Sequence, residues 1–413
     1  MMCKSWNWAS RQPKTWHHMK IAVHGYAGDH HKIMRLWSRY GEFVHSVDLQ
    51  LPIREQLRGL NDAFKAATEG KNLASFSLRL GESLSSQKHC SLEVKLQNLL
   101  DLLRSSDLQK LCINMEIFPS HIHEMLGCLR PRSFAHLQEL HLIVFIPGNG
   151  PSGYCGGQSG IKNLGLSNFI QLKVVAITWH HFYSELWDDL RVLPLEQLII
   201  HHSWCIGSFM GQHRCHSNKE RWEEFFQVNT KVKVTYVIKD RILGFFCGGL
   251  EGCKIHKLKM IGDRMVVNDF LGQYLKQFDH SSLESLVVGD VTFSELMKIN
   301  YTVPSELRLD LFKGLNLKYL CLCGPTLSPE RTVELVKRLK DLEVFLIPRA
   351  CILHPLPSPS MFCTAMSDEE ALDLEERISQ EMGYKWKLLG DLGQPRYSAA
   401  FREESIDERL LTD

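Results

Sequence analysis

A six-residue phrase, Leu-x-x-Leu-x-Leu/Ile/Val, recurs along this chain and constrains its fold more than any other feature. The clearest copies begin at Leu108, Leu137, Leu195, Leu283 and Leu317. Looser copies begin at Phe43, Leu73, Leu172, Val232, Ile255 and Leu342. The last three positions of the phrase alternate between buried and outward-facing residues, as a short β-strand with one buried face requires. About eleven copies at a mean spacing near 30 residues indicate a solenoid, in which each repeat packs on its neighbours.

A polar residue interrupts the apolar positions at the same place in several copies. These residues are Lys110, Glu139, Gln197, Lys257 and Ser285. Strands that are covered by helices on both faces carry nearly continuous apolar runs instead. We therefore expect one strand face to be open to water. An ordinary α/β domain whose strands contain leucine is the alternative.

The stretches between the copies carry helical patterns. Leucines recur at helical spacing across residues 92–103, and apolar residues recur with the same period across 267–278. Ser328 followed by Pro329 predicts the start of another helix. Strands and helices therefore alternate, and the strands should lie parallel in one sheet. We expect the clearest strands near 110–113, 139–142, 197–200, 285–288 and 319–322.

The residues before the first copy resemble the closing part of an F-box. That motif ends in Val-Cys-Lys-x-Trp, a short basic segment and another Trp, and Cys3, Trp6 and Trp16 stand at the matching places here. Leucine-rich repeats follow directly, so the chain resembles the F-box/leucine-rich-repeat protein family. The resemblance to the F-box covers only residues 1–18. The front of the motif, with its Leu-Pro-x-Glu and its adaptor-gripping helices, is absent.

This resemblance implies a substrate-recognition subunit of an SCF-type E3 ubiquitin ligase, in the ubiquitin-conjugation pathway. In that family the F-box holds the adaptor subunit and the repeats present the protein substrate. Lasting interfaces bury at least ~1,000 Å², which so short a remnant can hardly supply. We therefore expect the chain from Met1 to bind the adaptor weakly or not at all, and a version extended upstream to bind it well. The alternative is a leucine-rich-repeat interaction scaffold without a ubiquitin role, whose tryptophans only cap the first repeat.

The repeats depart from the common leucine-rich motif at one position. The motif continues to a buried Asn or Cys, and the matching residues here are Glu116, Phe145, Ser203, Val291 and Pro325. No Asn ladder is therefore expected. The predicted fold is an α/β, leucine-rich-repeat-like solenoid with irregular repeats and parallel strands on the concave face.

Three regions are expected along the chain. Residues 1–20 form the F-box-like remnant, 21–350 the solenoid, and 351–413 a proline-rich linker, a capping helix and an acidic tail. Ser367 and Glu370 make a capping box in front of the helix. The tail carries Glu403, Glu404, Asp407 and Glu408.

Side chains between the leucines should point to the concave wall, where they could contact a partner. The candidates are Lys110, Glu139, His141, Gln197, Lys257, Lys259 and Tyr319. They include both signs of charge and an aromatic ring, which suits a protein partner. The formal net charge is +1, so no nucleic acid or anionic membrane is expected.

The motifs that might carry chemistry are weak. Gly148–Gly153 matches G-x-G-x-x-G, but Pro151 and further glycines argue against the helix that a dinucleotide site needs. Cys205, His213, Cys215 and His216, with His201 and His202 nearby, lack the paired spacing of a zinc site. There is no nucleophile elbow, Walker lysine or His-Glu-x-x-His. We expect no catalytic residue, no metal and no cofactor, and hence no enzyme.

The cysteines and the amino terminus indicate a compartment. The thirteen cysteines are an odd number without paired spacing, which favours free thiols in a reducing environment. The first residues carry no apolar signal region, and the apolar runs are far shorter than the ~20 residues that cross a bilayer. A cytoplasmic or nuclear protein is expected.

Overall fold

The computed structural model describes most of the repeat strands and the helices of the later repeats. The described residues are 17–22, 43–51, 73–80, 107–116, 134–145, 165–178, 184–203, 219–240, 250–262, 267–276, 278–290, 307–323, 325–354 and 364–388. The expected helix at 92–103, the glycine motif at 148–153 and the first sixteen residues, up to Trp16, lie outside them.

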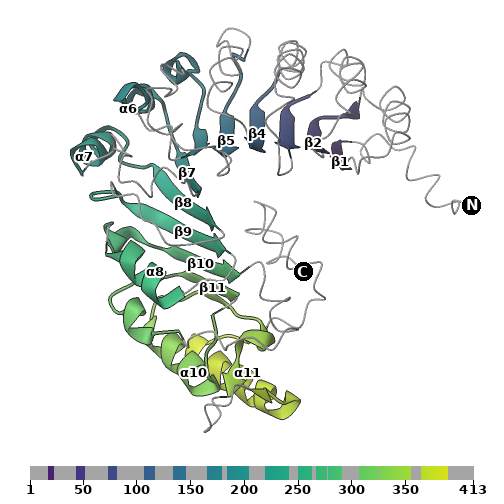
Figure 1. The fold of residues 1–413 in the computed structure, drawn as a ribbon, viewed down its shortest axis with the longest axis vertical. Coiled ribbons are helices and arrows are strands. Elements are labelled where there is room, and N and C mark those ends of the chain that lie inside the picture. The colour runs from purple at the N-terminus through teal and green to yellow at the C-terminus, as the bar shows by residue number, and fades with distance from the viewer. Residues whose placement is uncertain are drawn as a thin grey trace, which may run out of the picture. The chain divides into compact units, whose positions relative to one another are not determined.

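A sheet of twelve parallel strands follows the order of the chain, β1 to β12 (Figure 1). The strands of the first repeats are β1 (His18–Ala22), β2 (Ser46–Leu51), β3 (Ser75–Leu80), β4 (Lys110–Glu116), β5 (Glu139–Phe145), β6 (Val174–Thr178) and β7 (Gln197–Ser203). The later strands are β8 (Lys233–Asp240), β9 (Ile255–Gly262), β10 (Ser285–Asp290), β11 (Tyr319–Cys323) and β12 (Val344–Leu346). Every copy of the phrase leads into a strand, which confirms the predicted α/β repeat fold.

Helices and short 3-10 turns connect the strands. The described helices are α6 (Ser184–Val192), α7 (Lys219–Val228), α8 (Val267–Leu275), α10 (Pro329–Arg338) and α11 (Asp368–Met382). The 3-10 turns are η5 (Leu166–Asn168), η8 (His280–Ser282), η9 (Leu309–Phe312) and η10 (Arg349–Cys351). A separate antiparallel pair is formed by β13 (Leu353–His354) and β14 (Thr364–Ala365). Helix α8 confirms the pattern at 267–278, although it ends at Leu275, before Phe278.

The residue contacts divide the chain into two compact units. The first is made mostly of residues up to Val232 and contains β1–β6 and most of β7, and the second contains β8–β12 and α11. In the first unit the core leucines of neighbouring strands stand in register, as in the row Leu111, Leu140, Val175 and Leu198. Each of these side chains is at most 1% exposed. The ring of Trp187 on α6 packs edge-on against Phe225 of α7, with ring centroids 5.9 Å apart.

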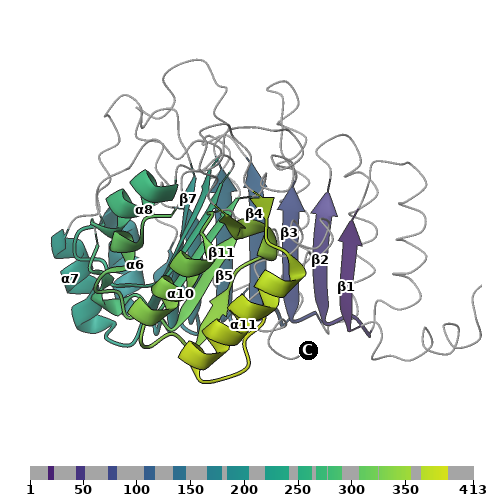
Figure 2. The same cartoon turned by 90° about the horizontal axis from the view of Figure 1, so that it is seen from below.

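The second unit repeats this arrangement. Leu258, Leu286, Leu320 and Phe345 stand in register on β9 to β12 and are buried. Helices α8 and α10 lie along the side of the sheet that these residues face (Figures 1 and 2). Helix α10 begins as predicted, because Ser328 Oγ accepts a hydrogen bond from Arg331 N and Pro329 takes the first helical position.

Backbone hydrogen bonds join neighbouring coils at the point where each strand begins. The carbonyl of Gln109 accepts from the N–H groups of both Gln138 and Glu139, at 2.7 and 2.9 Å. The carbonyl of Glu284 accepts in the same way from Lys318 and Tyr319, at 2.8 and 3.0 Å. The same double acceptance recurs at His17, His45, Ala74, Gln138, Lys173 and Lys318. This main-chain ladder satisfies polar groups between coils without any particular side chain.

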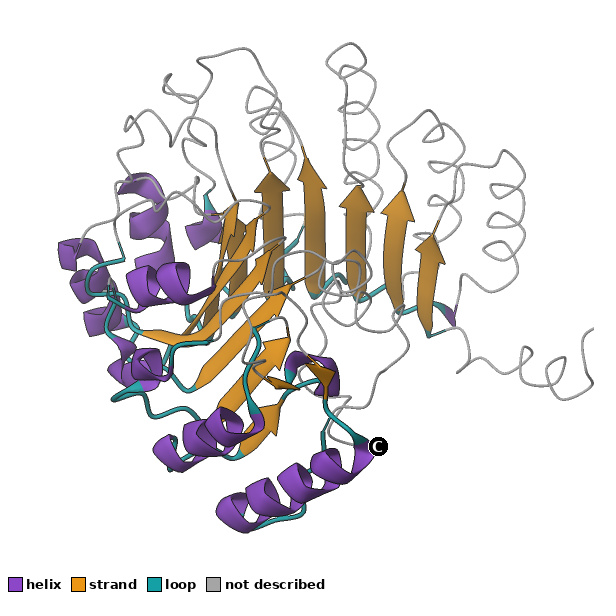
Figure 3. Ribbon diagram, turned by 60° about the horizontal axis from the view of Figure 1, so that its bottom comes forward, coloured by secondary structure: helices purple, strands orange, loops and turns teal. Residues whose placement is uncertain are grey.

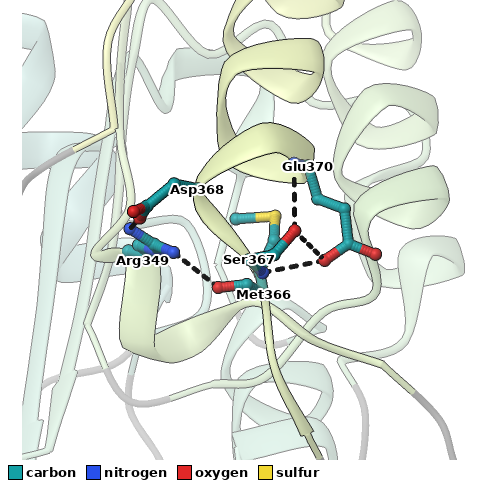
Figure 4. Close-up of polar contacts among 5 residues, drawn as sticks. All are labelled: Arg349, Met366, Ser367, Asp368 and Glu370. Carbon is teal, nitrogen blue, oxygen red and sulfur yellow. Dashed lines mark hydrogen bonds and ion pairs between the residues drawn. The ribbon is translucent and has the colours of Figure 1, made fainter.

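The last helix is held at its start by the predicted capping box (Figure 4). Ser367 Oγ accepts from Glu370 N, and the Glu370 carboxylate accepts from Ser367 N at 2.8 Å. Arg349 donates to the Met366 carbonyl at 2.6 Å and pairs with Asp368. These contacts fix the turn that precedes α11, so that α11 packs against α10.

The residues after α11 cover the outer edge of β12. The indole N–H of Trp386 donates to the Phe345 carbonyl at 2.7 Å, and the Tyr384 hydroxyl donates to the Glu343 carbonyl at 2.8 Å. The Trp386 ring also stacks on Phe345, with centroids 5.5 Å apart. An uncovered strand edge is a template for pairing with another chain, so this segment protects the last strand.

Candidate protein-binding face

The sheet has a second face, which we define as the strand positions that alternate with the buried core leucines. In the first unit one row of it is Lys110, Glu139, Val174 and Gln197, on β4 to β7. The next row is Cys112, His141, Ala176 and Ile199. The described helices lie on the opposite side of the strands (Figure 3). These rows contain the polar positions that interrupt the repeated phrase.

Ion pairs between neighbouring strands organise the second face of the first unit. Lys110 Nζ lies 2.7 Å from Glu139 Oε2, and His141 Nε2 lies 3.8 Å from the same oxygen. On β2 and β3, Asp48 Oδ1 lies 3.6 Å from Arg79 Nε. Half-exposed pairs of this kind contribute only about 0.2–1 kcal/mol to stability. Their main effect is to orient the charged groups on the face.

In the second unit, two rows of the same kind lie on β8 to β12 and have different chemistry. The first row is Thr235, Lys257, Ser285, Tyr319 and Val344. The second row is Val237, Lys259, Val287, Cys321 and Leu346. The lysines stand on one strand, β9, and the apolar residues gather on β10 to β12.

An apolar cluster forms in these rows. It consists of buried Val287, Cys321 and Cys323, with Tyr319 and Leu346 packed against them. The sulfur atoms of Cys321 and Cys323 lie 3.7 Å apart. The hydrogen bond between Cys323 and Cys321 and the burial of the thiol together hold the pKa of Cys323 well above its ordinary value of 9.0. Cys323 is therefore a neutral thiol that packs as an apolar side chain.

All the candidate residues on the strands stand at second-face positions, as the alternation of the phrase predicts. Their exposure is smaller than expected for a face open to water. Lys110, Glu139, Gln197, Lys257, Lys259 and Tyr319 are half-buried, and His141 is buried. Neighbouring strands are only ~4.8 Å apart, so adjacent side chains shield one another. Cys3, Trp6 and Trp16 lie outside the described residues, and so do Cys205, His213, Cys215 and His216.

The sequence did not single out the apolar part of this face. Val287 and Leu346 had no distinguishing signal, because an apolar residue beside a core leucine looks like another core residue. The register of β10, β11 and β12 brings them together with Tyr319. Within the described residues no group of three His, Cys, Asp or Glu side chains is placed to hold a metal ion.

A β-bulge lies at the edge of this surface. Between β8 and β9 the register shifts so that His256 is the extra residue, and Val234 N–H donates to its Nδ1 at 3.2 Å. A ring nitrogen that accepts must be unprotonated. Burial, opposed in part by the nearby Glu284 carboxylate and aided by Lys233, lowers the pKa of His256 below its ordinary 6.5. The bulge therefore depends on a neutral imidazole.

This gives a pH-dependent prediction for stability. His256 binds a proton less readily in the folded state than in the unfolded state. The contribution of neutral His256 to the free energy of unfolding is therefore complete above pH ~6.5 and is lost as the pH falls through the lower folded pKa. His256→Ala should cost about 1–3 kcal/mol at pH 7.5, since Val234 N–H loses its acceptor. His256→Asn places an amide oxygen where Nδ1 stands, so it should retain most of that stability and reduce the loss below pH 6.5. Urea unfolding at pH 5.5 and 7.5 measures both effects, and equal losses in the two variants would contradict the acceptor role.

Comparison with known proteins adds no family to this geometry. No protein-family model matches the chain, and no curated protein does. Among the helices that the structure describes, none is long and apolar enough to cross a membrane. The features that bear on function are therefore the face itself and the residues that resemble an F-box.

Proposed function

We propose that this chain is a substrate-recognition subunit of an SCF-type E3 ubiquitin ligase that binds a protein substrate through its leucine-rich repeats. The observation that carries the binding part is the second face, where charged, aromatic and apolar side chains stand in two rows across parallel strands. The ubiquitin part rests on the resemblance of Cys3, Trp6 and Trp16 to the end of an F-box. We assign the activity to the cytoplasm or nucleus.

The chemistry of the face favours a protein as the partner. Lys110 is paired with Glu139, so the described strands of the first unit present mixed charge and no stripe of cations for phosphate groups. In the second unit, an apolar cluster lies beside two lysines, and interface centres typically combine apolar or aromatic anchors with polar surroundings. A substrate receptor performs no bond chemistry. It raises the local concentration of its substrate near the conjugating enzyme.

Charge reversal on the face tests the binding part. Glu139→Lys places a second positive charge beside Lys110. It should weaken binding of the protein partner roughly tenfold or more. Glu196→Lys is the matched control, because Glu196 also pairs with a neighbouring coil, with Lys173 at 2.9 Å, but precedes β7 and lies off the face. The candidate substrates are the proteins that the full chain captures, that the Glu139→Lys variant fails to capture and that the Glu196→Lys variant still captures. Their ubiquitination should fall when the chain is depleted, and equal loss with both variants would contradict a role of the face.

Capture of the adaptor subunit tests the ubiquitin part. Chains that begin at Met1 and at any residues encoded upstream should be compared side by side, together with a Trp6→Ala/Trp16→Ala variant. Binding of the adaptor by the longer form, together with weaker binding by the tryptophan variant, supports the ligase assignment. Capture by neither form favours the second candidate, a leucine-rich-repeat scaffold that binds the same partner without any ubiquitin role.

A further inference from the structure

Two thiols stand together on the second face of β11, and we call Cys321 and Cys323 the thiol pair. They are two residues apart on one strand, so both side chains leave the sheet on the same side. Their sulfur atoms lie 3.7 Å apart, and each residue is 6% exposed. On β10 the register partner of Cys321 is Val287. The partner of Cys323 is Gly289, so no side chain of β10 stands beside that thiol.

A disulfide within the thiol pair does not suit the geometry of a strand. Positions two residues apart on a strand are separated by about 6.6 Å, twice the usual rise per residue. A disulfide requires Cβ atoms only about 3.5–4.5 Å apart. Closing the bond would therefore bend β11, which is paired on both sides with β10 and β12. The sulfurs are closer together than the strand positions that carry them, because the two side chains lean toward each other.

The separation of the two sulfurs does suit one metal ion placed between them. A metal–thiolate bond is about 2.3 Å long, so two sulfurs on one ion are about 3.8 Å apart at a tetrahedral angle and about 4.6 Å apart in a straight line. The observed 3.7 Å is at the short end of this range. Turning either side chain about its Cα–Cβ bond widens the separation without moving the strand.

The surroundings of the thiol pair select a soft ion that needs few ligands. The apolar cluster places Val287, Tyr319 and Leu346 around the pair, and none of them carries the carboxylate that a hard cation requires. A third thiol, Cys351 of η10, is near enough for its charge to raise the pKa of Cys323, but it is fully buried. Among the described residues no three His, Cys, Asp or Glu side chains are arranged to hold a metal ion, whereas structural zinc takes four ligands. Thiolates favour Cu(I), which two sulfurs alone can coordinate.

We propose that Cys321 and Cys323 bind one Cu(I) ion between their sulfur atoms. Two neutral thiols and Cu(I) give a dithiolate complex with a single negative charge, and the two thiol protons pass to water. Copper keeps its oxidation state, so the reaction needs no oxidant or reductant. This copper site goes beyond the proposed function and does not depend on it.

Alkylation of the reduced full chain tests the site without any substitution. One equivalent of Cu(I), supplied without oxygen as its acetonitrile complex, should slow alkylation of both Cys321 and Cys323 roughly tenfold or more, because a site filled beyond nine-tenths leaves less than a tenth of its thiols free. Mass spectrometry reads the rate at each cysteine. Cys112 is the matched control, since it is a buried second-face cysteine of β4 whose next neighbour on that face is Asn114. Its rate should not change.

Alanine variants then test whether the two sulfurs act together. In Cys321→Ala, Cu(I) should no longer slow the alkylation of Cys323, because one thiolate alone does not hold the ion. A coloured Cu(I) chelator should lose one equivalent of copper to the parent and to Cys112→Ala. It should keep that equivalent in the presence of Cys321→Ala or Cys323→Ala. Far-ultraviolet circular dichroism checks that each variant is folded.

Several results would overturn the copper site. They are unchanged alkylation with Cu(I), protection of only one of the two thiols, and protection of Cys323 that survives Cys321→Ala. Equal protection by Zn(II) would overturn the assignment to a monovalent ion. A peptide that carries both cysteines and has lost two hydrogens would reveal an intrastrand disulfide instead. Neither the adaptor nor a protein substrate is present in these experiments, so their failure leaves the proposed function to its own tests.

Discussion

Replacing Leu140 or Leu286 by alanine is expected to lower the free energy of unfolding by about 2–5 kcal/mol. Leu140 is 1% exposed and stands in register between Leu111 and Val175. Leu286 is fully buried between Leu258 and Leu320. Each repeat of a solenoid packs on its neighbours, so a cavity in one strand removes contacts to the strands on both sides. Urea unfolding followed by far-ultraviolet circular dichroism measures the loss.

Alternate positions on the same strands provide the matched controls. Gln197→Ala and Ser285→Ala change half-buried side chains of the second face and should alter stability by no more than about 0.5 kcal/mol. Losses of only that size for both leucine variants would mean that the leucines are not core residues. The repeat interpretation would then fail.

Trp386→Ala should cost about 3–5 kcal/mol and should also expose the edge of the last strand. The indole is 4% exposed, stacks on Phe345 and donates to its carbonyl. Ser379 Oγ accepts from Trp386 N at 2.8 Å, which ties the segment to α11. Because β12 would lose the cover on its outer carbonyls, we expect the variant to self-associate. Unfolding curves and size-exclusion chromatography over a range of concentrations measure the two effects.

Two milder variants separate packing from hydrogen bonding at this edge. Trp386→Phe keeps an aromatic ring against Phe345 and loses the N–H donor, so it should cost about 1–3 kcal/mol. Tyr384→Phe removes a hydrogen bond from an exposed ring and should cost about 0.5–1.5 kcal/mol. A Trp386→Ala protein that is as stable and as monomeric as the parent would show that the segment is not an edge cover.

Local sequence patterns were enough to predict the repeating strands and the start of the later helices. Alternation of leucine with other residues is a local property, because successive side chains of a strand point to opposite faces. The phrase therefore located β2 to β12, but His18–Ala22, which lacks it, was found only in the structure as β1. Capping is equally local, and Ser328 and Ser367 both begin helices as expected.

Sequence patterns did not predict how the repeats meet, because register and edge cover join residues far apart in the chain. The pairing of Lys110 with Glu139 and the apolar cluster at Val287 depend on which strand positions come opposite each other. The bulge at His256 depends on a backbone N–H twenty-two residues earlier in the chain, and the cover on β12 joins Trp386 to Phe345 across forty-one residues. The alternation of side chains along each strand placed the candidate residues on one face. Their burial arose from strand spacing, which brings side chains of separate repeats into contact.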